Sequence, residues 1–167
     1  MKTLSIAALV AVLLGAGMPA WADAGIRISD PYARILAGNG VVYFTIDNRQ
    51  AQSDQMIAAR SDAGMAMLMT SAQDAAGVMR MRMLPDGIAV AAGTAHALAP
   101  AADHVMLSGV MGRYKTGDTI TLTVTFATAG EVTLTVPVDN TRRTPPGPGP
   151  TAFDAMSVQG ADSGAAP

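Results

Sequence analysis

Short runs of alternating apolar and polar residues, separated by glycine, proline, asparagine and aspartate, make up most of the chain after its first two dozen positions. A period of two is typical of β-strands with one buried face, and no long run has the period of a helix. The clearest strands are expected at 41–47 (VVYFTID), 119–127 (TITLTVTFA) and 131–138 (EVTLTVPV). Further strands are expected at 55–60, 65–71, 78–84, 88–90, 95–98 and 104–110, with 65–71 and 78–84 forming a hairpin around a loop at 72–77. Many short strands at close spacing predict an all-β protein, an antiparallel β-sandwich or Greek-key barrel.

The two ends of the chain differ in character from this region. Lys2, an apolar run over 4–18 and the small-x-small sequence ending at Ala22 predict a signal peptide of residues 1–22, with cleavage after Ala24 as a near alternative. The apolar run is too short for a membrane span, so we expect export to the periplasm rather than a membrane anchor. Residues 141–167 are rich in proline and glycine and are expected to form a flexible, disordered tail. One domain of residues 23–140 remains between them.

Composition excludes several classes of function. The formal net charge is −2, and it becomes −3 without Lys2, so the chain lacks the basic surface that nucleic acids require. Cysteine is absent, which excludes disulfides, thiol nucleophiles and blue-copper centres. Two histidines and, after the signal peptide, the single glutamate Glu131 offer little for hydrolytic catalysis. We therefore expect a protein that is not an enzyme.

Methionine is the distinctive residue of this sequence. Six methionines fall into two alternating triplets, Met65, Met67 and Met69, then Met79, Met81 and Met83. His104 and Met106 alternate in the same way further along the chain. Because alternate residues of a strand share a face, three strands could present thioethers and an imidazole at one patch, and thioethers favour Cu(I). The competing interpretation is that these methionines fill a core, since the triplet at 79–83 alternates with arginine as a half-buried strand would.

A series of short motifs spans roughly residues 25–138. They are YFTIDN at 43–48, MT at 69–70, GVMRM at 77–81, AGT at 92–94, DHVML at 103–107, KTGD at 115–118, LTVTF at 122–126 and AGEV at 129–132. In this order they resemble the PCuAC family of periplasmic copper chaperones. The resemblance implies a cupredoxin-like sandwich that carries one Cu(I) on two histidines and two methionines, in the pattern H-x10-M-x21-H-x-M.

Carried over residue by residue, the resemblance implies a copper site at Met69, Met81, His104 and Met106. His104 and Met106 match the H-x-M element and Met81 the middle methionine, with Met79 as an alternative. Met69 stands where the family has its first histidine, and both spacings are one residue longer than in the family: 12 positions from Met69 to Met81 and 23 from Met81 to His104. We expect the site to survive with one histidine and three methionines, because a thioether is again a soft ligand.

The resemblance also implies the role. A monomeric carrier would deliver Cu(I) in the periplasm to a copper enzyme, in this family typically the CuA centre of cytochrome c oxidase, or to another copper-handling protein. The alternative is a metal-free interaction or structural module with a degenerate copper site. The remaining candidates are expected to pack or to play peripheral roles: Met65, Met67, Met83, His96, Asp103, Met111 and Met156.

Overall fold

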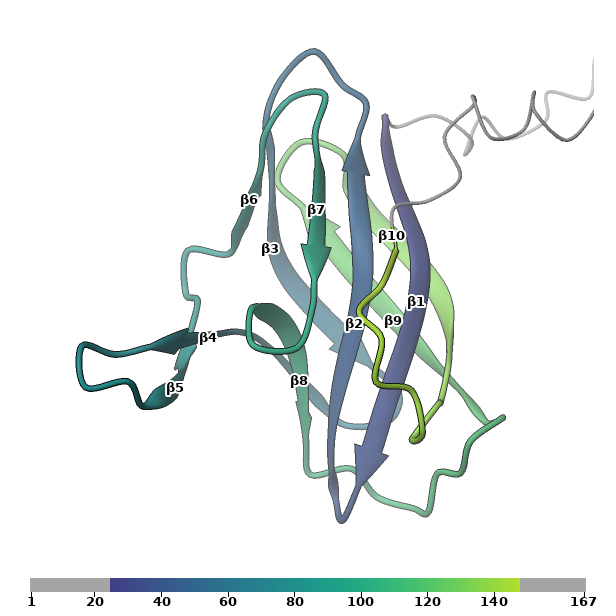
Figure 1. The fold of residues 1–167 in the computed structure, drawn as a ribbon. Coiled ribbons are helices and arrows are strands. Elements are labelled where there is room, and N and C mark those ends of the chain that lie inside the picture. The colour runs from purple at the N-terminus through teal and green to yellow at the C-terminus, as the bar shows by residue number, and fades with distance from the viewer. Residues whose placement is uncertain (1–24, 148–167) are drawn as a thin grey trace, which may run out of the picture.

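The computed structural model describes residues 25–147, and these form two packed antiparallel β-sheets (Figure 1). The strands are β1 (Ile26–Leu36), β2 (Asn39–Asn48), β3 (Asp54–Ser61), β4 (Met65–Gln73), β5 (Met79–Met83), β6 (Ile88–Val90), β7 (Ala95–Leu98), β8 (Asp103–Ser108), β9 (Thr119–Phe126) and β10 (Gly130–Pro137). The expected all-β sandwich is confirmed. Among residues 25–147, no helix is both long and apolar enough to cross a bilayer. The expected signal peptide lies outside the described residues.

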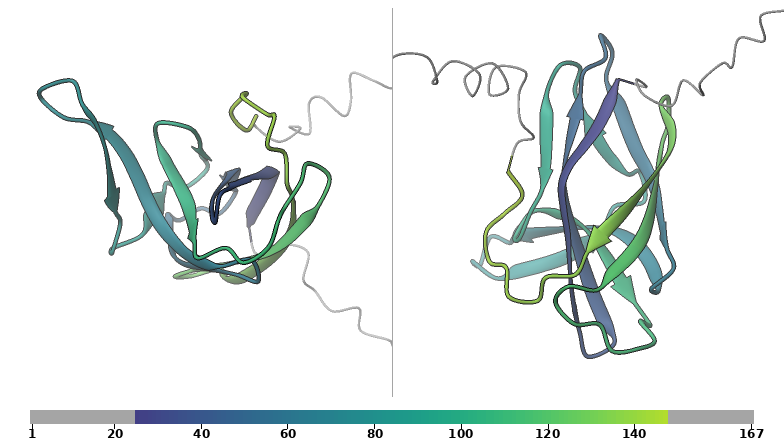
Figure 2. Two further views of the ribbon diagram at one scale, coloured as in Figure 1. Left: turned by 90° about the horizontal axis from the view of Figure 1, so that it is seen from below. Right: turned by 90° about the vertical axis from the view of Figure 1, so that its right-hand side faces the viewer.

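The larger sheet has the strand order β1-β2-β8-β4-β5, and the smaller sheet has the order β10-β9-β3-β6 (Figures 1 and 2). Strand β2 has two partners on the same side: its first half pairs with β8 and its second half with β7. β6 and β7 follow each other in the chain but belong to different sheets. The β4–β5 hairpin extends away from the body of the sandwich (Figure 1).

The core lies between the inner faces of the two sheets. Alternate residues of β2, namely Val42, Phe44 and Ile46, are fully buried there, opposite Leu122 and Val124 of β9. Each buried side chain of this size contributes roughly 1.5–3 kcal/mol relative to leaving it in water. As the Thr/apolar alternation of β9 predicts, this strand has one buried face, and its leucine, valine and phenylalanine side chains point into the core.

Strand β1 is missing from the sequence-based set of strands because its pattern is interrupted. Pro31 cannot donate a ladder hydrogen bond, and Asp30 has a left-handed backbone with φ of 52°. The register with β2 shifts between Ser29 and Tyr32, so Asp30 and Pro31 lie in a β-bulge. The strand therefore continues through a proline that would otherwise mark its end.

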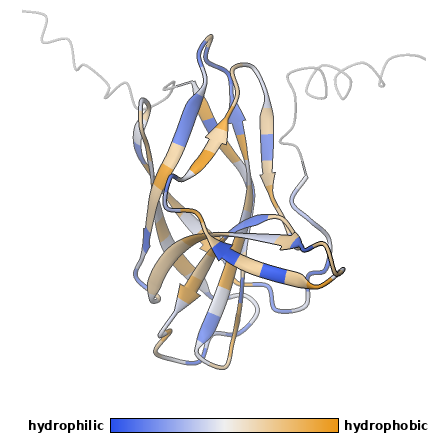
Figure 3. Cartoon of the chain, turned by 90° about the vertical axis from the view of Figure 1, so that its left-hand side faces the viewer, coloured by the Kyte–Doolittle hydropathy of each residue, from blue (hydrophilic) through white to orange (hydrophobic). Residues whose placement is uncertain are grey.

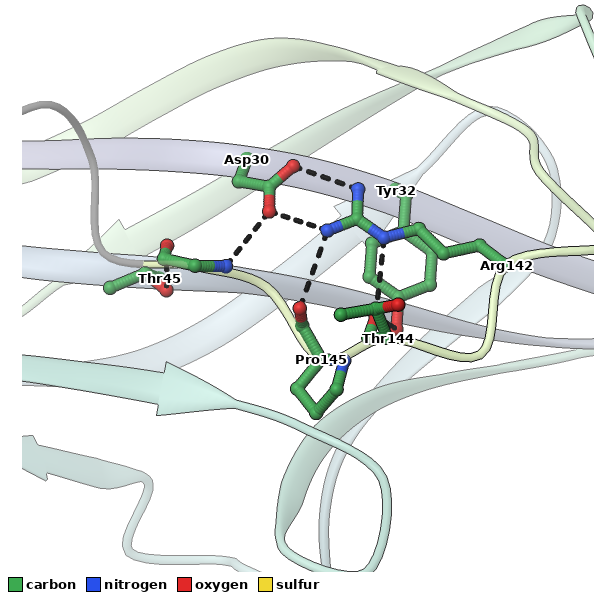
Figure 4. A network of polar contacts seen from close by, with 7 residues as sticks. Asp30, Tyr32, Thr45, Arg142, Thr144 and Pro145 are labelled. Carbon is green, nitrogen blue, oxygen red and sulfur yellow. Dashed lines mark hydrogen bonds and ion pairs between the residues drawn. The ribbon is translucent and has the colours of Figure 1, made fainter.

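The segment of residues 141–147, here called the strap, lies along β1 and β2 (Figure 4). The Arg142 guanidinium donates two hydrogen bonds to the Asp30 carboxylate and lies 4.1 Å from the centre of the Tyr32 ring. The hydrogen bond from Arg142 holds the pKa of Asp30 below its ordinary value, although burial opposes this effect. The first part of the expected tail is therefore attached to the sheet.

Backbone groups of the strap complete the attachment. The Gly147 amide donates to Asp30 (2.8 Å), and the Gly147 carbonyl accepts from the Thr45 hydroxyl (2.9 Å). The Tyr32 hydroxyl donates to the Thr144 carbonyl (3.1 Å). Residues 148–167, the remainder of the expected tail, lie outside the described residues.

Candidate metal centre

Strands β8, β4 and β5 lie side by side in the larger sheet, with β4 in the middle. Met69 of β4 is paired with His104 of β8 on one side and with Met83 of β5 on the other. Residues directly opposite each other in antiparallel strands project from the same face of the sheet. His104, Met69 and Met83 therefore form one row across three strands, here called the central row.

The rows on either side of the central row also carry thioethers. Met67 is paired with Met106, and Ser71 is paired with Met81. Because alternate residues share a face, all of these side chains project from the same side of the sheet. This surface, here called the methionine face, consists of Met65, Met67, Met69, Met79, Met81, Met83, His104 and Met106.

The methionine face is turned away from the hydrophobic core. The intervening residues Leu68, Val105 and Leu107 are buried in that core, so the methionines project from the outer side of the sandwich. Met83 is 62% exposed and Met65 is 68% exposed. The competing interpretation, in which the methionines fill a core, is therefore wrong for these two residues, because their strands bury the opposite face.

The hairpin that carries β5 is closed by its own polar groups. The Asp74 carboxylate accepts hydrogen bonds from the amides of Ala76 and Val78 and from the Arg80 guanidinium. Gly77 supplies the left-handed backbone of the turn, with φ of 81°. Arginine and methionine alternate along β5, which the hydropathy colouring of Figure 3 shows as alternating bands. The strand thus puts its charges on one face and its thioethers on the other.

His104 is the best-defined ligand candidate. Its imidazole is only 2% exposed, and its Nδ1 lies 3.0 Å from the Ala102 carbonyl oxygen. Since a carbonyl only accepts, Nδ1 must carry the proton, which leaves the lone pair of a neutral imidazole on Nε2. That Nε2 atom is buried and has no hydrogen-bond partner within the described part of the chain. A buried polar atom without a partner is costly, and a metal ion is one way to satisfy it.

Tyr43 flanks His104 on the side away from Met69. The two ring centres are 6.3 Å apart, and Tyr43 follows the β2 residues that pair with β8. Burial raises the pKa of the Tyr43 phenol, so the ring is a neutral neighbour at physiological pH. The sequence placed Tyr43 in a motif but gave no sign of this contact.

The second histidine faces elsewhere. His96 is paired with the core residue Ile46, so it projects from the face opposite to the methionines. Its Nε2 lies 3.0 Å from the carboxylate of Asp103. His96 thus pairs with a carboxylate and lies apart from the methionine face.

Within residues 25–147, no group of three or more histidine, aspartate and glutamate side chains is placed to hold a metal ion. The donors that the methionine face does offer are thioether sulfurs and one imidazole nitrogen. These donors suit a soft monovalent ion such as Cu(I) better than hard divalent cations, which prefer oxygen ligands.

Comparisons with known proteins give a family and a fold. Residues 26–138 match the family model described as LpqE-like. The chain belongs to the LpqE-like family. No curated protein matches this LpqE-like chain.

Solved structures of PCuAC domains resemble the LpqE-like chain. The copper-bound PCuAC domain from PmoF2 is 23% identical with a TM-score of 0.56, over 69% of this chain and 92% of that domain. The solution structure of apo-DR1885 from Deinococcus radiodurans is 22% identical with a TM-score of 0.54, over 83% of this chain and 95% of that protein. Its CuI-bound form is 24% identical with a TM-score of 0.53, over 68% and 79%. The expected PCuAC-like, cupredoxin-like fold is therefore confirmed.

Proposed function

We propose that this LpqE-like protein is a periplasmic copper carrier that binds one Cu(I) on its methionine face. The observation that carries the proposal is the His104 imidazole, whose buried Nε2 lone pair lacks a partner within the described residues and lies in a row with Met69. The shared fold with the copper-bound PCuAC domain from PmoF2 supports it.

The ligands that the PCuAC pattern selects are Met69, Met81, His104 and Met106. Met69 lies directly opposite His104 on β4, and Met106 is two residues further along β8 on the same face. β5 adds a thioether, for which the sequence pattern selects Met81, 59% exposed. A buried nitrogen beside two half-buried thioethers and one exposed thioether would let the ion enter and leave from the solvent side.

These ligands fit a carrier better than a catalyst. Thioethers bind Cu(I) without competing with protons, and they exchange more easily than thiolates would. Met69 replaces a titratable histidine of the PCuAC pattern, so the site would favour Cu(I) over Cu(II) more strongly. We propose a monomeric protein whose cargo is copper and whose recipient is a copper enzyme such as cytochrome c oxidase.

Anaerobic titration with Cu(I) against a chromophoric chelator tests this proposal. We expect one tight equivalent for the wild type, and a loss of affinity of at least about 10–100-fold for His104→Ala and Met69→Ala, since even outer-shell changes cost that much at metal sites. Met111→Leu is the control, because Met111 is 88% exposed and lies outside the methionine face.

Circular dichroism of each variant separates loss of ligand from loss of fold. Unchanged affinity in a folded His104→Ala variant would refute the copper site. Absence of Cu(I) binding by the wild type would instead favour the metal-free module, with the exposed methionines as a protein-binding surface.

A further inference from the structure

We infer that Met83, rather than Met81, is the main copper ligand on β5, and that Met81 and Met79 are successively weaker contacts toward the hairpin tip. This inference rests on the proposed function and concerns how that site is completed. The PCuAC sequence pattern does not select Met83, which the strand register places in the central row.

The register distinguishes three chemically identical side chains on one strand. Met83 is paired with Met69, whereas Met81 is paired with Ser71 and Met79 with Gln73. The backbone pairing continues beyond Met83, since the Leu84 amide donates to the Leu68 carbonyl (2.9 Å). Met83 is therefore held in its row by ladder contacts on both sides.

Sheet geometry turns this register into an order of distances. With strands about 4.8 Å apart and about 3.3 Å of rise per residue, the Cα atom of Met83 lies about 10 Å from that of His104, across the intervening Met69. The same spacing gives about 12 Å for Met81 and about 16 Å for Met79. An ion held between His104 and Met69 is thus closest to Met83.

The exposure of Met83 fits a ligand role better than a packing role. The side chains of Met79, Met81 and Met83 are 50%, 59% and 62% exposed, so none of them is held by the core. An unbranched thioether that is free to rotate can turn toward a neighbouring row at little cost. The three sulfurs would then form a series of exchangeable contacts leading from the buried imidazole toward solvent.

Three matched variants, Met83→Leu, Met81→Leu and Met79→Leu, test the order. Each replaces an exposed thioether by a hydrocarbon of similar size on the same face of the same strand, so we expect folding to be unaffected. In Cu(I) competition against a chromophoric chelator we expect affinity to fall more than about tenfold for Met83→Leu, a few-fold for Met81→Leu and less than about twofold for Met79→Leu.

Methyl resonances of the methionines provide a second readout on the wild type. On addition of one equivalent of Ag(I), a redox-inert analogue of Cu(I), the Met83 ε-methyl resonance is expected to shift more than those of Met81 and Met79. A larger affinity loss for Met81→Leu than for Met83→Leu, or equal losses for all three, would overturn the inference.

The failure of the inference is distinguishable from the failure of the proposed function. If the wild type binds Cu(I) and His104→Ala abolishes binding while Met83→Leu does not weaken it, only the role of Met83 is refuted. If His104→Ala has no effect, the copper site itself is refuted and the inference falls with it.

Discussion

At the scale of the residue, one hydrogen bond sets the chemistry of the candidate site. The Ala102 carbonyl fixes the proton of His104 on Nδ1 and leaves Nε2 as an acceptor without a partner among the described residues. The neighbouring position in the row holds Met69, where the PCuAC pattern has a second histidine. The site would then have a single nitrogen ligand, and its affinity for Cu(I) would depend more on thioether sulfurs than in the PCuAC pattern with two histidines.

Asn48, the last residue of β2, is a polar residue whose side chain stabilises the end of this strand. It is fully buried; its side-chain nitrogen Nδ2 donates to the carbonyls of Gln52 and Val90, and its side-chain oxygen accepts from the Gln50 backbone amide. Its place in the YFTIDN motif therefore has a structural explanation that does not involve copper.

We predict that Asn48→Ala lowers the free energy of unfolding by about 1–3 kcal/mol, because it leaves buried backbone groups without partners. Chemical denaturation followed by circular dichroism measures this change. Asn39→Ala on the same strand is the control, since Asn39 is exposed. Equal stability of the two variants would contradict the assignment.

At the scale of the element, the sequence predicted most strands and the hairpin correctly because their alternation is strong. It missed β1, where the bulge at Asp30 and Pro31 interrupts the pattern. The sequence pattern selected Met81, with Met79 as the alternative, and gave no reason to place Met83 in the site. All methionines of β5 share one face, and only the pairing with β4 decides which of them lies beside Met69.

The strap is the element whose attachment depends on charge. Its contact to β1 uses the Asp30 carboxylate, and the hydrogen bond from Arg142 keeps the pKa of that carboxyl below the ordinary value of 3.8. A lowered folded-state pKa means that the contact contributes stability above the unfolded-state pKa and loses it as the pH falls through the folded-state value.

We therefore predict that the strap stays bound from neutral pH down to about pH 4 and detaches only in stronger acid. The amide proton shift of Gly147, which donates to Asp30, follows this transition by NMR. Asp30→Asn should remove the transition, whereas Asp47→Asn, at a β2 carboxylate that pairs with Arg49, should leave it in place. A transition near neutral pH would contradict the prediction.

At the scale of the whole molecule, the core residues and the candidate metal ligands lie on opposite faces of one sheet. Leu68, Val105 and Leu107 pack into the core, while the methionines between them project outward. The fold is thus held together by apolar burial, unlike small domains in which metal binding supplies the folding energy. The side chains on the outer face of the three strands do not belong to this core, so they can vary without loss of the fold, as at Met69, where the PCuAC pattern has a histidine.

The exposure of the methionine face has a further consequence in an oxidising environment. Oxidants convert accessible methionines to sulfoxides, which present oxygen in place of a soft sulfur.

We predict that mild peroxide oxidises Met79, Met81 and Met83 well before Met56, which is fully buried, and that Cu(I) affinity falls in parallel while the fold persists. Peptide mass spectrometry beside Cu(I) titration measures both, and affinity that survives oxidation of all three residues would contradict the prediction. The same sulfurs that would make the protein a Cu(I) carrier would then make its capacity sensitive to oxidative stress, and reversible wherever sulfoxides are reduced.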